Sequence, residues 1–263
     1  MLTFVGLGLF DERSITVEGR EALAGADHVV AEFYTSQLAG TTIEKLESYH
    51  DVSIEVRERA GIEQEPGSIL DAAETEQVVF LTGGDPMIST THVDLRLRAT
   101  ARNIDTRIIH GTTAASAASS LTGLQNYRFG KATTLPFPYA HGGDSVPQSV
   151  IDTIDDNRER GLHTLVYLDI KADRGEYMTA DTAAALLSSA YETEDDDGTL
   201  AVAVCRAGSS DPVIEADCLS VLADHNFGAP LHLLVIPGDL HHMESDALRE
   251  LAGAPVGLLP TLD

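Results

Sequence analysis

Tryptophan is absent from this chain of 263 residues, and phenylalanine and tyrosine contribute only seven residues each. The interior must therefore be built mainly from aliphatic side chains, and a hydrophobic fraction of 43% is enough for a sizeable core. The length exceeds the roughly 100–200 residues of an ordinary domain, so we expect two domains.

Cysteine and long apolar runs are also scarce. Cys205 and Cys218 are the only cysteines, too few for a disulfide framework and without a CxxC pair for zinc or redox chemistry. Cys205 lies in an apolar segment, where a cysteine is usually a small core residue rather than a nucleophile. No apolar run approaches the ~18 residues of a membrane span, and residues 1–10 lack the basic flank of a signal peptide. We therefore expect a cytoplasmic protein without a membrane segment.

Lysine is nearly missing, with Lys45, Lys131 and Lys171 as its only occurrences. The chain has 42 acidic and 17 basic residues, which gives a formal net charge of −25. Such a surface suits a high-salt cytoplasm, because the Debye length falls to about 3 Å at 1 M salt and self-repulsion is screened. The alternative is an acidic protein of ordinary cytoplasm. Both interpretations argue against nucleic-acid binding, which requires a basic patch.

Short apolar runs alternate with helical patterns along the whole chain, which indicates an α/β fold. Strands are expected at residues 2–6, 29–34, 52–56, 78–81, 107–110, 163–168, 200–205 and 231–236. Helices are expected after Thr16, on a stripe formed by Val93, Leu97, Ala101 and Ile104, from residues 111–120, and over 146–154, 179–191 and 242–252. Residues 192–198 should form a solvated acidic loop. The rhythm changes near residues 111–130, so we predict an N-terminal α/β domain of residues 1–111 and a C-terminal α/β domain of residues 112–263.

A glycine pair, Gly6 and Gly8, follows the first expected strand and lets the backbone approach a ligand or a neighbouring strand. A dinucleotide-binding fingerprint needs a third glycine three residues on, at the start of a helix. That position is Asp11, and no helix is expected before about Thr16, so a nicotinamide site is rejected. The pair alone could also form a plain tight turn.

A second glycine-rich segment, Gly83-Gly84-Asp85-Pro86, follows the buried strand at residues 78–81. Ligands of α/β proteins bind outside the carboxyl ends of the strands, so the glycines would expose backbone there and Asp85 would supply a carboxylate. Alternatively, Asp85 only caps a helix that begins near Met87.

Two more segments stand beside expected strands. Residues 110–117, His-Gly-Thr-Thr-Ala-Ala-Ser-Ala, offer hydroxyls and backbone to a ligand, or equally form a close helix contact between domains. Residues 206–209 and 230–232 lie in the second half of the chain and could be ordinary turns.

Together these segments resemble the tetrapyrrole methylase superfamily, whose members are S-adenosylmethionine-dependent methyltransferases that bind the cofactor in the cleft between two α/β domains. Residues 84–95, Gly-Asp-Pro-Met-Ile-Ser-Thr-Thr-His-Val-Asp-Leu, resemble the diphthine synthase version of the family loop, in which Thr-Thr-His is distinctive. Residues 123–131, 168–172, 177–179 and 236–241, with Glu244, are also similar to that family. The resemblance runs from residue 2 to residue 251.

The resemblance implies a set of residues that bind S-adenosyl-L-methionine and its product S-adenosyl-L-homocysteine, many through the backbone: Leu9, Asp85, Ile88, Thr113, Ala114, Leu168, Ala207 and His232. Thr112 and Thr113 keep the hydroxyls of the serines that many members have there, whereas Ala114 and Ala115 replace bulkier residues. No metal is expected, because His241, His242 and Glu244 lack both a fourth ligand and the spacing of a zinc motif.

The resemblance also implies the reaction. The substrate would be the amino group of an aminocarboxypropyl arm on a histidine of translation elongation factor 2, methylated repeatedly to trimethylated diphthine by a homodimer. Our own hypothesis is that Asp85 positions the cofactor and that no residue serves as an essential general base, because the proton of the amine could leave to solvent. The catalytic residues therefore stay unassigned. One alternative is a precorrin methyltransferase of the same superfamily, against which residues 90–92 and 127–130 argue. The other is a non-catalytic cofactor-binding regulator.

Overall fold

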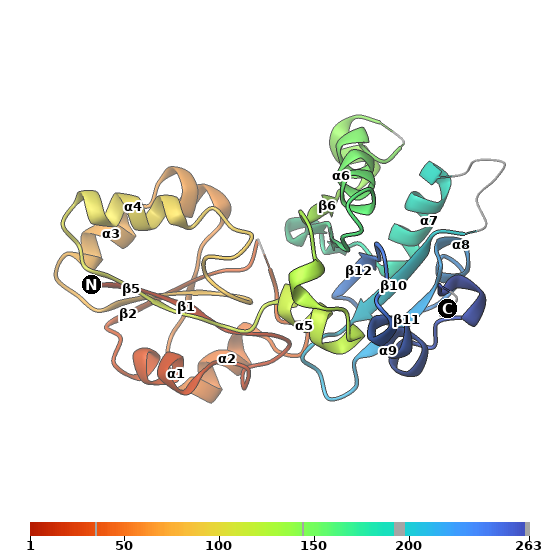
Figure 1. Ribbon diagram of the computed structural model, residues 1–263. Coiled ribbons are helices and arrows are strands. Elements are labelled where there is room, and N and C mark those ends of the chain that lie inside the picture. The colour runs from red at the N-terminus through yellow and green to blue at the C-terminus, as the bar shows by residue number, and fades with distance from the viewer. Residues whose placement is uncertain (35, 144, 192–197, 261–263) are drawn as a thin grey trace. The chain divides into compact units, whose positions relative to one another are not determined.

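The computed structural model describes residues 1–34, 36–143, 145–191 and 198–260 (Figure 1). Residues 192–197 of the expected acidic loop lie outside this set. The chain divides into two compact units, an N-terminal unit of Met1–Thr113 and Ala172–Arg174, and a C-terminal unit of Ala114–Lys171 and Gly175–Asp263. Each unit has its own sheet and its own core, as expected for an α/β protein.

The N-terminal unit is built on a five-stranded parallel sheet in the order β3-β2-β4-β1-β5. Its strands are β1 (Leu2–Gly6), β2 (His28–Glu32), β3 (Glu55–Val56), β4 (Val78–Thr82) and β5 (Thr106–Ile109). Every residue of β1 and β4 is buried, which requires cover on both faces of the sheet. The continuous apolar runs in the sequence therefore mark the central strands.

Helices cover both faces of this sheet (Figure 1). On one side lie α1 (Val17–Ala24) and α2 (Ile43–His50); on the other lie α3 (Gly67–Ala73), α4 (Val93–Ala101) and the π-helical turn η1 (Ala60–Gln64). Thr16 caps α1, as predicted, because its side chain accepts a hydrogen bond from the backbone N–H of Gly19 at 3.0 Å.

The apolar stripe predicted around α4 is not the buried face of that helix. Leu95 and Ala99 are buried against the sheet, whereas Val93 and Leu97 are 54% and 62% exposed. Ile104 is buried but lies beyond the end of the helix. The sequence contains two apolar pairs spaced by four residues, and periodicity alone does not tell which pair faces the sheet.

The C-terminal unit has a mixed sheet in the order β11-β10-β12-β7-β6. Its strands are β6 (Thr133–Leu135), β7 (Thr164–Leu168), β10 (Leu200–Cys205), β11 (Val213–Cys218) and β12 (His232–Ile236), and a separate hairpin is formed by β8 (Ile170–Lys171) and β9 (Glu176–Tyr177). β6 is parallel to β7, and the remaining pairs of the sheet are antiparallel.

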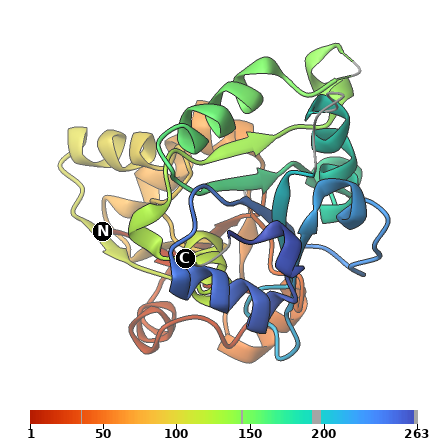
Figure 2. The ribbon, with the colours of Figure 1, turned by 45° about the vertical axis from the view of Figure 1, so that its right-hand side comes forward.

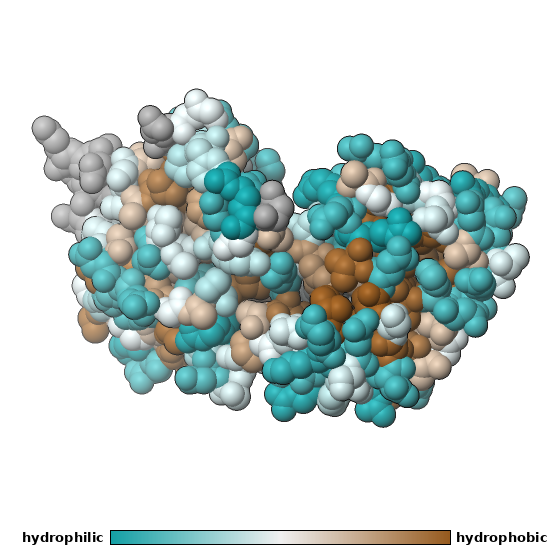
Figure 3. All heavy atoms as spheres, turned by 180° about the vertical axis from the view of Figure 1, so that it is seen from behind, coloured by the Kyte–Doolittle hydropathy of each residue, from teal (hydrophilic) through white to brown (hydrophobic). Residues whose placement is uncertain are grey.

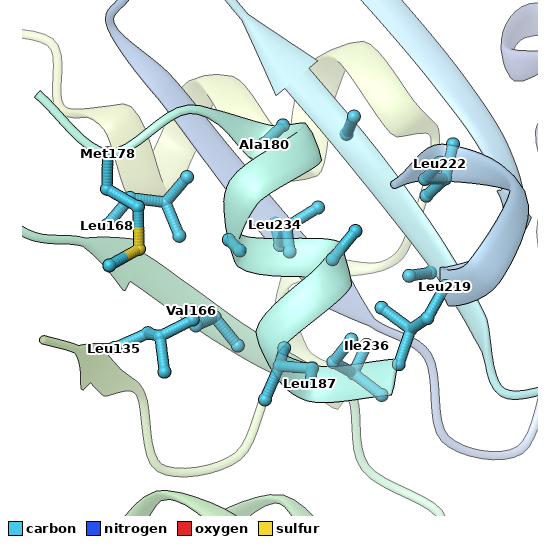
Figure 4. Close-up of a cluster of buried hydrophobic side chains, with 14 of the residues drawn as sticks. Leu135, Val166, Leu168, Met178, Ala180, Leu187, Leu219, Leu222, Leu234 and Ile236 are labelled. Carbon is cyan, nitrogen blue, oxygen red and sulfur yellow. The ribbon is translucent and has the colours of Figure 1, made fainter. Parts of the chain in front are cut away.

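The helices of this unit also form two layers, one on each side of the sheet (Figure 2). α6 (Gln148–Arg158), α7 (Ala180–Tyr191) and α8 (Leu219–Leu222) cover one face, and α5 (Ala114–Thr122) and α9 (His242–Ala252) cover the other. Figure 4 shows α7 against the sheet, with Met178 beside Leu168 and Leu187 close to Ile236. These contacts join aliphatic and thioether side chains.

Short 3-10 turns complete the described chain: η2 (Asn126–Arg128), η3 (Pro138–His141), η4 (Ala172–Arg174) and η5 (Val256–Leu258). None of the described helices combines the length and the apolar character needed to cross a bilayer. On the face shown in Figure 3, hydrophilic residues predominate, and an apolar area lies on the N-terminal unit, at the right.

Candidate cofactor-binding site

Three adjacent parallel strands of the N-terminal unit, β4, β1 and β5, end in loops whose backbones touch. A Cβ atom on Gly6 would lie 2.4 Å from the carbonyl oxygen of Gly84 and 2.7 Å from the nitrogen of Gly111. A Cβ atom on Gly111 would lie 2.2 Å from the same carbonyl oxygen. Only glycine fits at these points, so the carboxyl end of the sheet presents bare backbone where α/β proteins bind ligands.

Reciprocal hydrogen bonds join the loops after β1 and β4. The N–H of Gly8 donates to the carbonyl of Gly84 at 3.1 Å, and the N–H of Gly84 donates to the carbonyl of Gly8 at 2.8 Å. Both residues have φ of +73°, a conformation that glycine adopts without strain. The neighbouring Leu9 is held in place, because its carbonyl accepts hydrogen bonds from the Ser14 hydroxyl and the Asp11 N–H. The glycine pair of the sequence is thus more than a plain tight turn.

Asp85 is a buried carboxylate that ties two of these loops together. Its Oδ2 accepts hydrogen bonds from Nδ1 of His110 at 2.7 Å and from the N–H of Gly111 at 3.3 Å, and its Oδ1 accepts from the N–H of Met87 at 2.9 Å. No helix begins near Met87 within the described segment 36–143, since α4 begins at Val93; the helix-cap interpretation is therefore wrong. Ile88, three residues after Asp85, is 51% exposed.

In the C-terminal unit, residues predicted to bind the cofactor lie at the same end of the sheet. β12 runs antiparallel to both β7 and β10, so its first residue, His232, lies beside the last residues of those strands. Leu168 ends β7, and Ala207 follows β10 by two residues. Arg206, which has φ of +53°, donates from Nη1 to the carbonyl of Phe227 at 2.5 Å and thereby braces the turn.

Both nitrogens of the His232 ring form hydrogen bonds within the protein. Its Nδ1 accepts from the N–H of Ala180, at the start of α7, at 3.1 Å, and its Nε2 donates to the carbonyl of Ala229 at 2.9 Å. Burial lowers the pKa of His232, which keeps the ring neutral in this arrangement. Both ring nitrogens of His232 are therefore engaged within the protein.

Comparison with known proteins shows which family these features belong to. A model of the tetrapyrrole (corrin/porphyrin) methylases matches residues 1–221. The diphthine synthase of Natronomonas pharaonis is 68% identical over 269 residues, which covers 99% of each chain, and that of Halobacterium salinarum is 64% identical over 98% of this chain and 100% of the relative. The chain belongs to the diphthine synthase family.

The predicted α/β fold of the tetrapyrrole methylase type is confirmed. A crystal structure of diphthine synthase matches with a TM-score of 0.89 and 39% identity over 98% of each chain. The organisms of the two relatives are halophilic archaea, which agrees with the expectation drawn from the net charge of −25.

The Thr-Thr-His segment of the diphthine synthase family has a structural role in this chain. His92 is buried, and its Nδ1 donates to the carbonyl of Pro86 at 3.1 Å, which fixes the loop that carries Asp85. Its Nε2 lies 3.4 Å from Oε1 of Glu32, which also accepts from the Thr82 hydroxyl at 2.5 Å. Burial lowers the pKa of His92, and the Glu32 carboxylate opposes that shift. Glu32 was missed in the sequence, although a carboxylate inside the otherwise apolar segment 29–34 was a signal that could have found it.

Two other family segments also hold loops in place. Oδ2 of Asp169 accepts from the N–H of Phe137 at 3.0 Å and pairs with Nζ of Lys171 at 3.1 Å. Glu244 is fully buried and accepts hydrogen bonds from the N–H groups of Gln125 and His241, both at 2.9 Å, and from Nε2 of His163 at 3.0 Å.

Glu244 and Cys205 have structural explanations. Burial alone would raise the pKa of Glu244, but the hydrogen bonds from Gln125, His241 and His163 lower it below its ordinary value.

Within residues 1–34, 36–143, 145–191 and 198–260, no group of three or more His, Cys, Asp or Glu side chains could hold a metal ion. Cys205 is buried in β10, and burial raises its pKa to about 12, so the prediction of a core cysteine is confirmed.

Proposed function

We propose that this protein trimethylates the amino group of an aminocarboxypropyl arm on a histidine of translation elongation factor 2, with S-adenosyl-L-methionine as the methyl donor, in diphthamide biosynthesis. The observation that carries this proposal is the 68% identity to a diphthine synthase over 99% of each chain. The precorrin and regulator alternatives have weaker support, because relatives that match the chain from end to end are diphthine synthases.

We assign the cofactor contacts to both units. Leu9, Asp85, Ile88 and Thr113 belong to the N-terminal unit, and Ala114, Leu168, Ala207 and His232 belong to the C-terminal unit. The glycine contacts at the ends of β4, β1 and β5 support this assignment, because they leave backbone open to a ligand. Asp85 and His232 have side chains that are already hydrogen-bonded within the protein, so we infer that they position loops and contact the cofactor mainly through backbone atoms.

The methyl donor supplies a methyl group that its sulfonium charge already activates, and no metal is needed for its transfer. The chain then has to hold the amine in line with the methyl group and keep water out. The rigid joining of the loops by Gly8, Gly84 and Asp85 suits this task, because positioning is lost when loops move.

The family resemblance supports three further parts of the proposal. The functional halves correspond to an N-terminal domain of residues 1–111 and a C-terminal domain of residues 112–263. The protein acts as a homodimer in the cytoplasm. Its macromolecular partner is elongation factor 2, and an acidic enzyme can approach an acidic partner at high salt because their repulsion is screened.

A methyl-transfer assay at high salt tests this function. Labelled S-adenosylmethionine is offered with elongation factor 2 that carries the aminocarboxypropyl-histidine intermediate, and unmodified factor is the control. We expect label on the intermediate-bearing factor alone, and a gain of three methyl groups in its intact mass. Protein that binds the cofactor but leaves this factor unlabelled would contradict the proposal.

A further inference from the structure

An exposed histidine, His110, contacts the buried side chain of Asp85 at the carboxyl end of the N-terminal sheet. Nδ1 of His110 lies 2.7 Å from Oδ2 of Asp85, and the two side chains are 74% and 4% exposed. The residues are 25 positions apart in the sequence and follow two different strands, β5 and β4. The sequence marked both segments but gave no reason to pair them.

The contact fixes how the ring carries its proton. An ionised carboxylate only accepts hydrogen bonds, so Nδ1 must be the protonated nitrogen, and the lone pair of neutral His110 is then on Nε2. The same Oδ2 also accepts from the N–H of Gly111, which fixes the direction of the carboxylate. A buried carboxylate that orients a neutral imidazole and stabilises its protonated form is the arrangement of histidine bases in several enzyme classes.

We propose that His110 is the proton acceptor for the amine and that Asp85 is its positioning residue. This inference rests on the proposed function, in which the acceptor is an amine that must be uncharged when it attacks. Among the described residues, Asp85 is the ionisable residue whose side chain contacts the ring of His110.

The proton balance of trimethylation suits an exposed base. Nε2 of His110 takes a proton from the ammonium form, and the freed nitrogen lone pair forms a bond to the methyl carbon as the carbon–sulfur bond breaks. The monomethyl and dimethyl ammonium products each lose a proton in the same way, and the trimethyl product has none to lose. Three transfers thus release three protons, and the 74% exposed ring returns each proton to solvent.

Substitution to glutamine separates proton transfer from a merely structural role. In His110→Gln the side-chain amide can still donate to Asp85, but it cannot accept a proton. We expect a loss of about 10²–10⁴-fold in single-turnover methyl transfer near neutral pH, with affinity for S-adenosylhomocysteine changed less than about threefold. The rate should rise again toward alkaline pH, where solvent deprotonates the amine. In His110→Ala, added imidazole should restore part of the rate, which a structural defect would not allow.

The matched control is His225→Gln. His225 also pairs with a carboxylate through Nδ1, at 2.8 Å from Glu215, but Glu215 is 39% exposed and lies within the antiparallel strand β11. We expect full activity in this variant. A His110→Gln enzyme that keeps wild-type rates across the pH range would overturn the proposal, as would a His110→Ala enzyme that imidazole leaves unchanged.

A measurement without turnover keeps this inference separate from the proposed function. Nitrogen–proton correlation NMR of the wild-type protein with bound S-adenosylhomocysteine reports the tautomer of His110. A proton on Nδ1 supports the proposal, and a neutral ring with its proton on Nε2 refutes it, whether or not the factor is methylated. If the wild-type enzyme leaves the factor unlabelled while the NMR shows the Nδ1 tautomer, the proposed substrate is wrong and the role of His110 toward its amine fails with it, while the orientation of the ring by Asp85 is supported.

Discussion

The two sheets of this protein hold the loops at their strand ends mainly by different means. In the N-terminal unit, the loops that contain Gly6, Gly84 and Gly111 lie so close together that there is no room for a side chain at Gly6 or Gly111. In the C-terminal unit, buried polar side chains hold loops through hydrogen bonds to the backbone at both ends of the sheet. His232 does so where β7 and β10 end, and the Glu244–His163 pair does so at the opposite end. The carboxyl ends of parallel strands all lie at the same end of a sheet. In a mixed sheet they lie at both ends, so each loop has to be held in place separately.

The largest expected effect is in the C-terminal unit, at Glu244. Replacing Glu244 by Ala removes a fully buried carboxylate and leaves the N–H groups of Gln125 and His241 without their acceptor. His163 loses its acceptor as well, and each buried donor left without a partner costs about 1–3 kcal/mol, so urea unfolding in high salt should show a loss of about 3–5 kcal/mol.

The isosteric change Glu244→Gln keeps an acceptor oxygen and should cost clearly less. If the two variants were equally stable, the hydrogen bonds of Glu244 would not be what holds this unit, and the contrast between the units would fail.

The second effect is in the N-terminal unit, at Gly111. A Cβ atom there would meet the carbonyl of Gly84 at 2.2 Å, and this neighbour is backbone that cannot rotate away. Forced repacking of this kind costs about 1–3 kcal/mol, so Gly111→Ala should weaken cofactor binding by roughly tenfold to a hundredfold in equilibrium dialysis.

Gly67→Ala is the control for this change, because a Cβ atom at Gly67 has nothing within 4 Å and the residue begins helix α3. It should leave cofactor binding unchanged. Equal losses in both variants would show that any glycine substitution harms the unit, and that the close contact of the loops is not special.

The difference between the units also explains what the sequence could predict. Glycines after apolar strands are visible in the sequence, so the segments of the N-terminal unit whose loops meet at the strand ends, including Asp85, could be singled out from it. The partners of buried polar groups come from distant positions, as in Gln125 with Glu244 or Ala180 with His232, and no local pattern pairs them. For the same reason the pairing of His110 with Asp85, and the choice between the two apolar pairs of α4, needed the structure.

The smallest effect is the pH dependence of stability, which separates three buried histidines. Burial lowers the pKa of His163, His232 and His92 below 6.5. The unfolded chain therefore takes up protons below about pH 6.5 while the folded chain does not, so stability is complete above that pH and is lost as pH falls toward the lowered pKa values.

The surroundings of the three rings differ, and so should the pH dependence of their variants. Nδ1 of His163 accepts from the N–H of Gly238, and Nδ1 of His232 accepts from the N–H of Ala180, so protonation breaks a hydrogen bond in the C-terminal unit. The polar groups beside the ring of His92, in contrast, are acceptors: the Pro86 carbonyl and the Glu32 carboxylate. Each histidine that stays unprotonated in the folded state while it is protonated in the unfolded state lowers the free energy of unfolding by up to about 1.4 kcal/mol per pH unit.

His232→Gln keeps both hydrogen-bonding roles without a titrating group, so it should flatten the fall in unfolding free energy between pH 6.5 and 5.5 by more than His92→Gln does. Urea titrations of both variants at constant high salt check this. Equal flattening would mean that burial alone controls these histidines, and that the hydrogen bonds to Ala180 and Gly238 add nothing to the acid sensitivity of the C-terminal unit.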